Sequence, residues 1–562
     1  MDPRDGRDVP DDLDDDADLD EAGDDADDVS DLADLDDVGD ADDRPSSEGL
    51  LDDRIEDLFD DRAAGGPVDV LRGPMPDRDD DEHSGLGAAF DEDEPADPDD
   101  APLPPLDEQA ADDLLTRYLE IEKALTARWP ESRLEPSLDR VLGVVDLLGD
   151  PQRAVPVIHV AGTNGKTSTA RMIESLLRSL GLRTGLFTSP HLHTVRERVR
   201  LDGEPIDLER FVRVYDDIEP YLGMVDALSA EAGGPALSYF EALTMLGFAA
   251  FADAPVDVAV VECGMGGAWD ATNVADGTVA VVTPISYDHT DYLGSTLTAI
   301  AGEKAGIIKD GATAVLAAQE LEAAEVLLAR CAEVGAAIAR EGVEFGVVSR
   351  TPAVGGQLVA LQGPAGRYDD VFLPLFGAHQ AANAAVALAA VEAFLGGGTA
   401  PLNDDLVRAG FAQVTSPGRL EIVRRSPTVI VDAAHNPHGA AALAAAIADG
   451  FEFTALVGVI GVLSDKDARG VLEALEPVLA EVVVTRSSSA RATDPDELAA
   501  IAVEVLGADR VRVEPRLPDA LDVAIERADE LAADHGGGAG VLVTGSVVTA
   551  AEARSLLGRA DA

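Results

Sequence analysis

From about residue 108 onwards, short apolar runs alternate with longer stretches of helical period. Residues 112–125 repeat apolar side chains at a spacing of about 3.6 and predict an amphipathic helix. Further apolar runs predict strands over residues 155–160, 184–187, 256–261, 279–283 and 313–317, with helices between them that include 168–180 and 236–252. This alternation is typical of an α/β fold, in which a parallel sheet is covered by helices on both faces.

A second series of strands and helices begins after residues 416–418, which read Ser-Pro-Gly. Its strands are predicted over residues 428–431, 453–459, 481–485 and 540–544. We therefore expect two doubly wound parallel-sheet domains, over residues 108–415 and 416–562, with a hinge near 416–418. The second domain should be smaller and Rossmann-like. Because ligands of such sheets bind at the carboxyl ends of the strands, functional residues are expected in the loops that follow them.

Residues 1–107 break this pattern. Residues 1–100 alone hold 42 of the 108 Asp and Glu residues and only 7 Arg, a net charge of −35 out of −66 for the chain. They show no sustained helical or strand period and too little apolar content for a core, so we expect a disordered acidic tail. A solvating segment and a partner-binding arm both fit such a tail. The remaining chain is acidic too, which argues against binding to nucleic acid or to an anionic membrane.

The other compositional features indicate the compartment. Two cysteines, Cys263 and Cys331, are too few for a disulfide framework or for a zinc site of their own. The first residues, MDPRDGRD, are too acidic for a secretory or transit signal, and no apolar run reaches the length of a membrane span. We therefore expect a cytoplasmic protein whose partners are small molecules.

Residues 157–169, VIHVAGTNGKTST, carry the clearest chemical signal. An apolar strand enters a glycine-containing turn and leaves into a helix that should begin at Lys166 and Thr167. Backbone N–H groups at such a helix start face phosphate, Lys166 can reach the terminal phosphates, and Thr167 can hold Mg²⁺. Val160 stands where the common phosphate loop has glycine. The core Gly-Thr-Asn-Gly-Lys-Thr resembles the variant of amide-bond ligases that activate a carboxylate with ATP, so we expect residues 108–415 to form a P-loop-type ATPase domain.

Two later strand ends of this domain also deliver polar side chains. Glu262 closes the apolar run 256–262, where a carboxylate usually forms the second anchor for the nucleotide's Mg²⁺. His289 follows the strand near 279–283 and can ligate a second Mg²⁺, although oxygen ligands are commoner for this ion. An ordinary solvent-facing acid is the alternative for Glu262, and a structural or solvated histidine is the alternative for His289 taken alone. The phosphate loop upstream favours a ligand role for both residues.

The second domain has a similar strand end. Residues 428–431 lead into Asp432, which could hold a ribose hydroxyl, and into His435 and Asn436, which could meet a substrate carboxylate or phosphate. A helix cap followed by an Asn-Pro turn is the alternative explanation. Arg419, next to the hinge, could close onto a phosphate as the domains meet, or could form a surface ion pair.

Taken together, these motifs resemble the folylpolyglutamate synthase/dihydrofolate synthase family, a branch of the Mur ligases, over roughly residues 108–562. The matching segments are GTNGKTS at 162–168, TSPHL at 188–192, VECGMGG at 261–267, WDATN at 269–273, DHTDYLG at 288–294, EKAGIIK at 303–309, HQAAN at 379–383, SPGR at 416–419, DAAHNP at 432–437, GVLSDKD at 461–467 and VTGS at 543–546.

The resemblance implies a role for each matching position. It assigns ATP binding to Asn164, Gly165, Lys166, Thr167, Ser168, Asn383, Arg419 and Asp432. It assigns metal binding to Thr167, Ser189, Glu262 and His289, and substrate contacts to Phe240, Asp270 and Ser546. It implies catalytic roles for Lys166, His289, Lys304 and His435, and Lys304 matches a lysine that is carbamylated in the family.

The resemblance also implies a reaction. The expected activity is ATP-dependent ligation of L-glutamate to dihydropteroate, to (tetrahydro)folate polyglutamates or to both, through an acyl phosphate and with two Mg²⁺ ions, in a monomer. One alternative is a ligase of peptidoglycan precursors that acts on a UDP-sugar peptide with the same ATPase core. Another is a nucleotide-binding regulator that has lost catalysis, although the joint presence of Lys166, Glu262, His289 and Lys304 argues against such decay.

Overall fold

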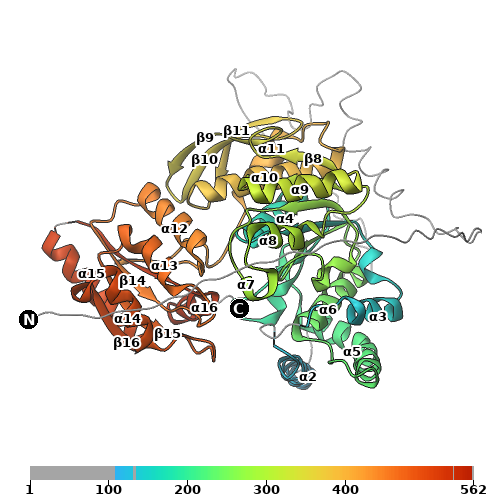
Figure 1. Ribbon diagram of the computed structural model, residues 1–562, viewed down its shortest axis with the longest axis horizontal. Helices are drawn as coiled ribbons and strands as arrows, with labels where there is room; N and C mark the ends of the chain where they lie inside the picture. The colour runs from blue at the N-terminus through green and yellow to red at the C-terminus, as the bar shows by residue number, and fades with distance from the viewer. Residues whose placement is uncertain (1–107, 131–134, 536, 560–562) are drawn as a thin grey trace, which may run out of the picture. The chain divides into compact units, whose positions relative to one another are not determined.

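The computed structural model describes residues 108–130, 135–535 and 537–559 (Figure 1). The acidic tail predicted over residues 1–107 lies outside the described residues. Within them, the chain forms two large sheets and one small sheet, ordered β4-β3-β2-β5-β1-β6-β7-β8, β11-β10-β9 and β12-β13-β17-β14-β15-β16.

The first sheet has eight strands, and the phosphate-loop strand β1 lies inside it. Its strands are β1 Val157–Ala161, β2 Thr184–Phe187, β3 Val199–Leu201, β4 Glu204–Pro205, β5 Val258–Glu262, β6 Gly277–Val282, β7 Thr313–Leu316 and β8 Ala337–Arg340. β1 pairs in parallel with β5 and β6, whereas β3 and β4 form an antiparallel edge. The residues of β1 and β5 are all buried, as expected for central strands covered on both faces.

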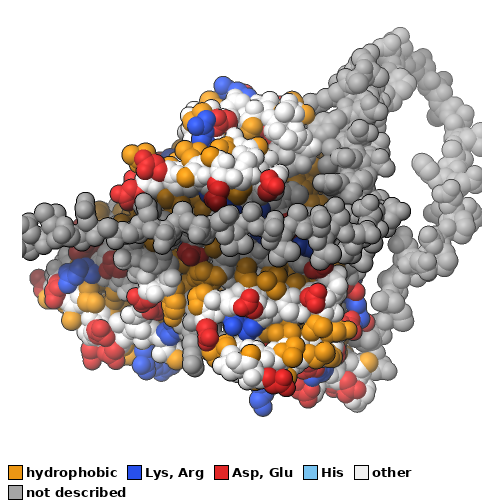
Figure 2. Space-filling model, turned by 45° about the vertical axis from the view of Figure 1, so that its right-hand side comes forward, with side chains coloured by type: hydrophobic (Ala, Val, Ile, Leu, Met, Phe, Trp, Pro, Cys, Tyr) orange, Lys and Arg blue, Asp and Glu red, His pale blue; other side chains and the backbone are white. Residues whose placement is uncertain are grey.

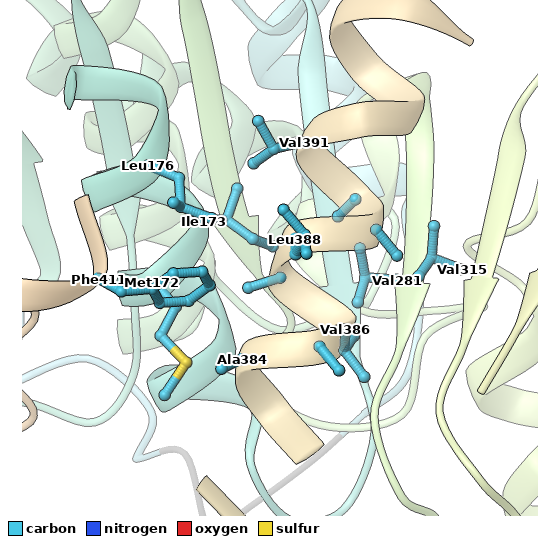
Figure 3. Close-up of a cluster of buried hydrophobic side chains, with 14 of the residues drawn as sticks. Met172, Ile173, Leu176, Val281, Val315, Ala384, Val386, Leu388, Val391 and Phe411 are labelled. Carbon is cyan, nitrogen blue, oxygen red and sulfur yellow. The ribbon is translucent and has the colours of Figure 1, made fainter. Parts of the chain in front are cut away.

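Helices cover both faces of this sheet. One face packs against α4 (Lys166–Ser179) and α10 (Ala378–Gly396), where Leu388 and Val391 of α10 lie against Ile173 and Leu176 of α4 (Figure 3). The other face packs against two groups of helices. These are α2 Glu108–Thr126, α3 Asp139–Leu148, α5 Leu208–Glu231 and α6 Tyr239–Asp253, and, beyond β6, α8 Leu297–Ala305 and α9 Leu321–Val334.

A small antiparallel sheet follows β8 and was not predicted. It consists of β9 Gly346–Ala353, β10 Gly356–Gln362 and β11 Arg367–Leu373, beside α10 in Figure 1. Its inner residues, among them Val359, Leu361 and Tyr368, join the core formed by α4 and α10. The helix α11 (Asp404–Ala412) closes this part of the chain. Most of β9 is exposed or half-exposed, so its sequence lacks the apolar run by which the buried strands were recognised.

The second large sheet has six strands, β12 Glu421–Arg425, β13 Thr428–Val431, β14 Ala455–Ile460, β15 Glu481–Arg486, β16 Val511–Arg516 and β17 Ala539–Thr544. All pair in parallel except β12, which is antiparallel to β13. One face packs against α12 Pro437–Gly450, α13 Ala468–Leu475 and α14 Pro495–Leu506, and the other against α15 Leu517–His535 and α16 Val547–Leu556.

The predicted fold class, two doubly wound α/β sheets, is confirmed. Several details differ. Antiparallel strands lie at the edges of the predicted parallel sheets, at β3, β4 and β12. The helix expected from residue 236 begins at Tyr239, because Ser238 and Glu241 form a capping box that fixes its start. The domain limits at 108, 415 and 416 stay a prediction. No helix in the described part of the chain is both long and apolar enough to cross a membrane.

Candidate functional site

Every residue that the sequence predicted for the site lines one cavity of about 1060 Å³. The cavity lies where the carboxyl ends of β1, β5 and β6 face the hinge and the loops that follow β13 and β14. Its lining therefore combines residues from both large sheets. The sequence predicted that these motifs, although far apart along the chain, come together, and the cavity agrees with that prediction. The role of each residue stays a prediction.

The phosphate loop runs from Gly162 to the start of α4. Gly162 and Gly165 have φ angles of 142° and 87°, and a Cβ added at Gly162 would lie 1.9 Å from Thr283 Oγ1. Glycine is required at that position because both the side chain and the backbone oxygen of Thr283 approach so closely. Among the described residues, the N–H groups of Lys166 and Thr167 have no protein acceptor, and α4 has no side-chain cap. This helix start can therefore receive an anion such as phosphate.

A buried carboxylate stands beside that helix start. Glu262, 1% exposed, accepts hydrogen bonds from Thr167 Oγ1 at 2.9 and 3.0 Å and from Ser189 N at 3.4 Å. Burial raises the pKa of Glu262, although the charge of Lys166 and the hydrogen bond from Thr167 oppose this rise. Within the described residues no cation lies within ion-pair distance of Glu262, and a carboxylate beside a hydroxyl is chemically suited to Mg²⁺.

The described residues contain no group of three or more His, Cys, Asp or Glu side chains arranged to hold a metal. A Mg²⁺ site does not need such a group, because this ion keeps several water ligands and is commonly bound by one or two carboxylates together with substrate phosphates. The donor set around Glu262 therefore fits a nucleotide-bound Mg²⁺ better than an independent metal centre.

Two basic side chains, those of Lys304 and His289, line the same cavity near the phosphate loop. Lys304, at the end of α8, is 4% exposed and donates from Nζ to Gly162 O at 2.8 Å. Burial, aided by the charge of Lys166, lowers the pKa of Lys304 to about 7. His289 precedes α7 (Thr290–Leu293) with a left-handed φ of 51°, and burial lowers its pKa to about 4. Its imidazole is therefore neutral at pH 7, the form that ligates metals.

Sequence reasoning missed a connection centred on Asp288. Its Oδ1 accepts from Lys466 Nζ at 2.5 Å, and its Oδ2 accepts from Asn436 Nδ2 at 3.0 Å and lies 3.2 Å from His435 Nε2. Burial raises the pKa of Asp288, but the hydrogen bond from His435 and the nearby positive charges outweigh burial and hold it far below its usual range. One signal was available, because Lys466 is one of only five lysines and follows a predicted strand.

Three further predicted residues line the same cavity. Asn383 of α10 approaches it so closely that a Cβ on Gly165 would lie 2.6 Å from its Oδ1. Asp432, at the end of β13, accepts from the N–H groups of Ala434 and Leu420 at 2.8 and 2.7 Å. In the part of the chain that the structure describes, the guanidinium of Arg419 has no hydrogen-bond or ion-pair partner. It is therefore available to an anionic ligand.

The predicted substrate residues lie in the wall of the cavity. Asp270 accepts from Met265 N at 2.8 Å and from Thr272 Oγ1 at 2.5 Å, so its carboxylate already holds its own loop. Ser546 caps α16 by accepting from Thr549 N at 3.0 Å. The ring of Phe240 lies against Gly264, where an added Cβ would be 2.5 Å from the ring. These contacts give Asp270 and Ser546 a structural role in shaping the cavity.

The first domain carries a phosphate loop, and the Rossmann-like second domain faces the end of the sheet where that loop lies. This arrangement is that of a two-domain, ATP-dependent ligase. Two family models match the chain in that order. They are the Mur ligase middle domain over residues 160–391 and the Mur ligase glutamate ligase domain over residues 418–547.

Comparison with individual relatives identifies the family within this class of ligases. The chain is 55% identical over 463 residues to the dihydrofolate synthase/folylpolyglutamate synthase of Mycobacterium tuberculosis, covering 80% of this chain and 95% of the relative. It is 36% identical over 346 residues to the Escherichia coli protein of the same name, covering 62% and 76%. This chain belongs to the dihydrofolate synthase/folylpolyglutamate synthase family, as its motifs predicted.

Solved structures agree with this assignment. The fold matches Mycobacterium tuberculosis folylpolyglutamate synthase complexed with ADP at a TM-score of 0.77 and 53% identity, covering 80% of this chain and all of the other. It matches Escherichia coli FolC in complex with DHPP and ADP at a TM-score of 0.66 and 32% identity, covering 79% and 97%. The alternative of a UDP-sugar peptide ligase is supported only at the level of the shared Mur ligase domains.

Proposed function

We propose that this chain joins L-glutamate to dihydropteroate, to a folate or its polyglutamates, or to both, in an ATP-dependent ligation. The observation that carries the proposal is the single cavity that combines the phosphate loop, Glu262 and the loops after β13 and β14. Such a cavity can hold a nucleotide, an acceptor carboxylate and an amine at once. The family membership supports the choice of glutamate as the amine and of a pteridine-linked carboxylate as the acceptor.

The reaction proceeds in two steps. The acceptor carboxylate attacks the γ-phosphorus of ATP, the bond to ADP breaks, and an acyl phosphate forms. Lys166 and the guanidinium of Arg419 offset the negative charge of the transferred phosphoryl group. The neutral amine of glutamate then attacks the acyl carbon, and phosphate leaves. Contact between the two domains excludes the water that would otherwise hydrolyse the acyl phosphate.

The residues present fit a divalent cation. Thr167, Ser189 and Glu262 would hold a first Mg²⁺, and His289 would help hold a second. Bound Mg²⁺ supplies charge neutralisation on the phosphates. We further propose that Lys304 is carbamylated. Its lowered pKa leaves much of its amine uncharged near pH 7, and an uncharged amine can add to CO₂ with loss of one proton. The resulting anion would stand on the metal side of the phosphate loop.

Further proposals concern the surroundings of the enzyme. Its ligands should be ATP, L-glutamate and a pteridine acceptor, without nucleic acid or membrane, and we expect a cytoplasmic monomer. On the face visible in Figure 2, acidic and basic side chains are interspersed over the described residues. The chain's net charge of −66 supports the proposal that polyanions are not its partners.

ADP release by the purified chain tests the function. Mg²⁺-ATP and L-glutamate are supplied with dihydropteroate in one tube and with tetrahydrofolate in another, at low and high salt, and the product is weighed for one added glutamyl residue. Release and product with both acceptors assign both activities, and with one acceptor assign that activity alone. Silence with both acceptors would refute the proposed function. A Lys166→Met variant serves as the control for contaminating ATPases.

A further inference from the structure

The carboxylate of Asp288 connects the two large sheets across the cavity. Asp288 lies in the loop after β6, whereas Lys466, Asn436 and His435 follow strands of the second sheet. The side chain of Asp288 is only 8% exposed, and each of its two carboxylate oxygens contacts a residue of the second domain. A buried carboxylate with such partners forms stronger hydrogen bonds than a neutral acceptor would.

One of the partners of Asp288, Asn436, also contacts the phosphate loop. Asn436 Nδ2, besides binding Asp288, donates to Asn164 Oδ1 at 3.1 Å, and Asn164 Nδ2 donates back to Asn436 Oδ1 at 3.3 Å. The start of α12 is thus held simultaneously against Asp288 and against the loop that would bind ATP. Loss of the link at Asp288 would leave Lys466 buried without its counter-charge, which favours separation of the two domains over an intact contact.

Asp288 also immediately precedes a predicted metal ligand. Its Oδ1 accepts from the backbone N–H of His289 at 2.9 Å, and Lys466 Nζ lies 3.4 Å from His289 Nε2. His289 has a left-handed backbone, which a non-glycine residue adopts only when its surroundings hold it there. The position of the second domain and the orientation of His289 are therefore set at the same point of the chain.

We propose that Asp288 is a positioning residue that holds the second domain closed over the phosphate loop, so that the acyl phosphate meets the amine of glutamate and not water. The inference rests on the proposed function, because it concerns the fate of that intermediate. Attack by water returns the acceptor carboxylate and phosphate, and ADP then accumulates without ligated product. The number of products formed per ADP released reports closure separately from the overall rate.

The test compares this ratio in the full chain and in variants at saturating glutamate. Asp288→Asn keeps the size of the side chain but removes the charge that faces three side chains of the second domain. We expect its product-to-ADP ratio to fall about tenfold, the effect of losing one charge-assisted hydrogen bond. Asp310→Asn, an exposed acid of the same domain, is the matched control and should keep the wild-type ratio.

A second variant changes Asn436, a partner of Asp288 in the second domain. Asn436→Asp still accepts from Gly439 N as the cap of α12, but it replaces the donor that faces Asp288 with a second carboxylate. We expect the ratio to fall for this variant also. The double variant Asp288→Asn/Asn436→Asp exchanges amide and carboxylate, so its ratio should exceed that of Asn436→Asp, in which two carboxylates face each other.

The outcomes separate the inference from the function. A wild-type chain that forms no ligated product refutes the proposed function itself. A wild-type chain that ligates, with single variants that lose rate but keep the product-to-ADP ratio, refutes the role of Asp288 alone. Additive losses in the double variant would also overturn it, since a purely structural loss at each position is not rescued by the exchange.

Discussion

Replacing Lys304 with methionine should stabilise the ligand-free protein while it abolishes ligation. The side chain keeps a similar length in Lys304→Met but loses the amine that burial forces toward its neutral form. Ligation should fall at least about a hundredfold, because a group on the metal side of the phosphate loop is lost. An increase in stability together with loss of activity is the expected signature of a residue retained for function.

The size of the gain follows from the structure. The pKa of Lys304 falls from 10.5 to about 7, and at about 1.4 kcal/mol per pKa unit this costs the folded state about 4 kcal/mol at pH 7. The variant also loses the 2.8 Å hydrogen bond to Gly162 O, and the buried carbonyl left behind costs about 2 kcal/mol. The net expectation is a free energy of unfolding about 2 kcal/mol higher than that of the wild type.

The pH dependence has a definite sign. Between pH 7 and 10.5 the unfolded chain binds more protons at residue 304 than the folded chain does, so wild-type stability rises with pH. The advantage of Lys304→Met should therefore be full below pH 7 and shrink as the pH rises toward 10. Buffers must be free of CO₂, because a carbamate would remove the titrating amine.

Urea unfolding, followed by tryptophan fluorescence, measures the free energy of unfolding of Lys304→Met and of the wild type at each pH. Both tryptophans, Trp129 and Trp269, precede the hinge, so the signal reports the domain that contains Lys304. Lys123→Met, at an exposed position of α2, is the matched control and should stay within about 0.5 kcal/mol of the wild type. An unchanged or lower stability of Lys304→Met at pH 7, or a gain that grows with pH, would refute the reasoning.

Three further substitutions have specific expected results. Lys166→Ala should abolish ligation with an unchanged urea midpoint, and near-normal turnover would contradict the phosphate-loop assignment. Gly162→Ala should lose nucleotide binding in calorimetry and at least about 2 kcal/mol of stability, because the new Cβ would lie 1.9 Å from Thr283 Oγ1; an unaltered affinity would show that the loop can relax. Arg554→Ala breaks a 2.7 Å ion pair with Glu421 in which the arginine side chain is 3% exposed, and it should cost about 3 kcal/mol by circular dichroism; a loss below about 1 kcal/mol would mean that the pair is effectively solvated.

The buried strands were predictable because each carries its own signal. β2 and β13 match their predicted limits, and the other predicted strands differ by a few residues at their ends. Two of the strands that were missed, β9 and β16, are exposed or half-exposed along their whole length. One face of such a strand packs against the protein and the other faces solvent, so its sequence has no continuous apolar run.

The sequence by itself determined the class of fold, the phosphate loop and the family. Those features depend on residues that are close along the chain: an apolar run, a turn that requires glycine at Gly162 and Gly165, and a helix that begins at Lys166. Only the tertiary structure decided which distant groups meet. Asp288 and Lys466 are 178 positions apart, and their contact exists because packing brings the second sheet over the loop after β6. Tertiary packing within the first domain also removes water from Lys304 and lowers its pKa, a property that depends on burial and that residue identity alone does not reveal.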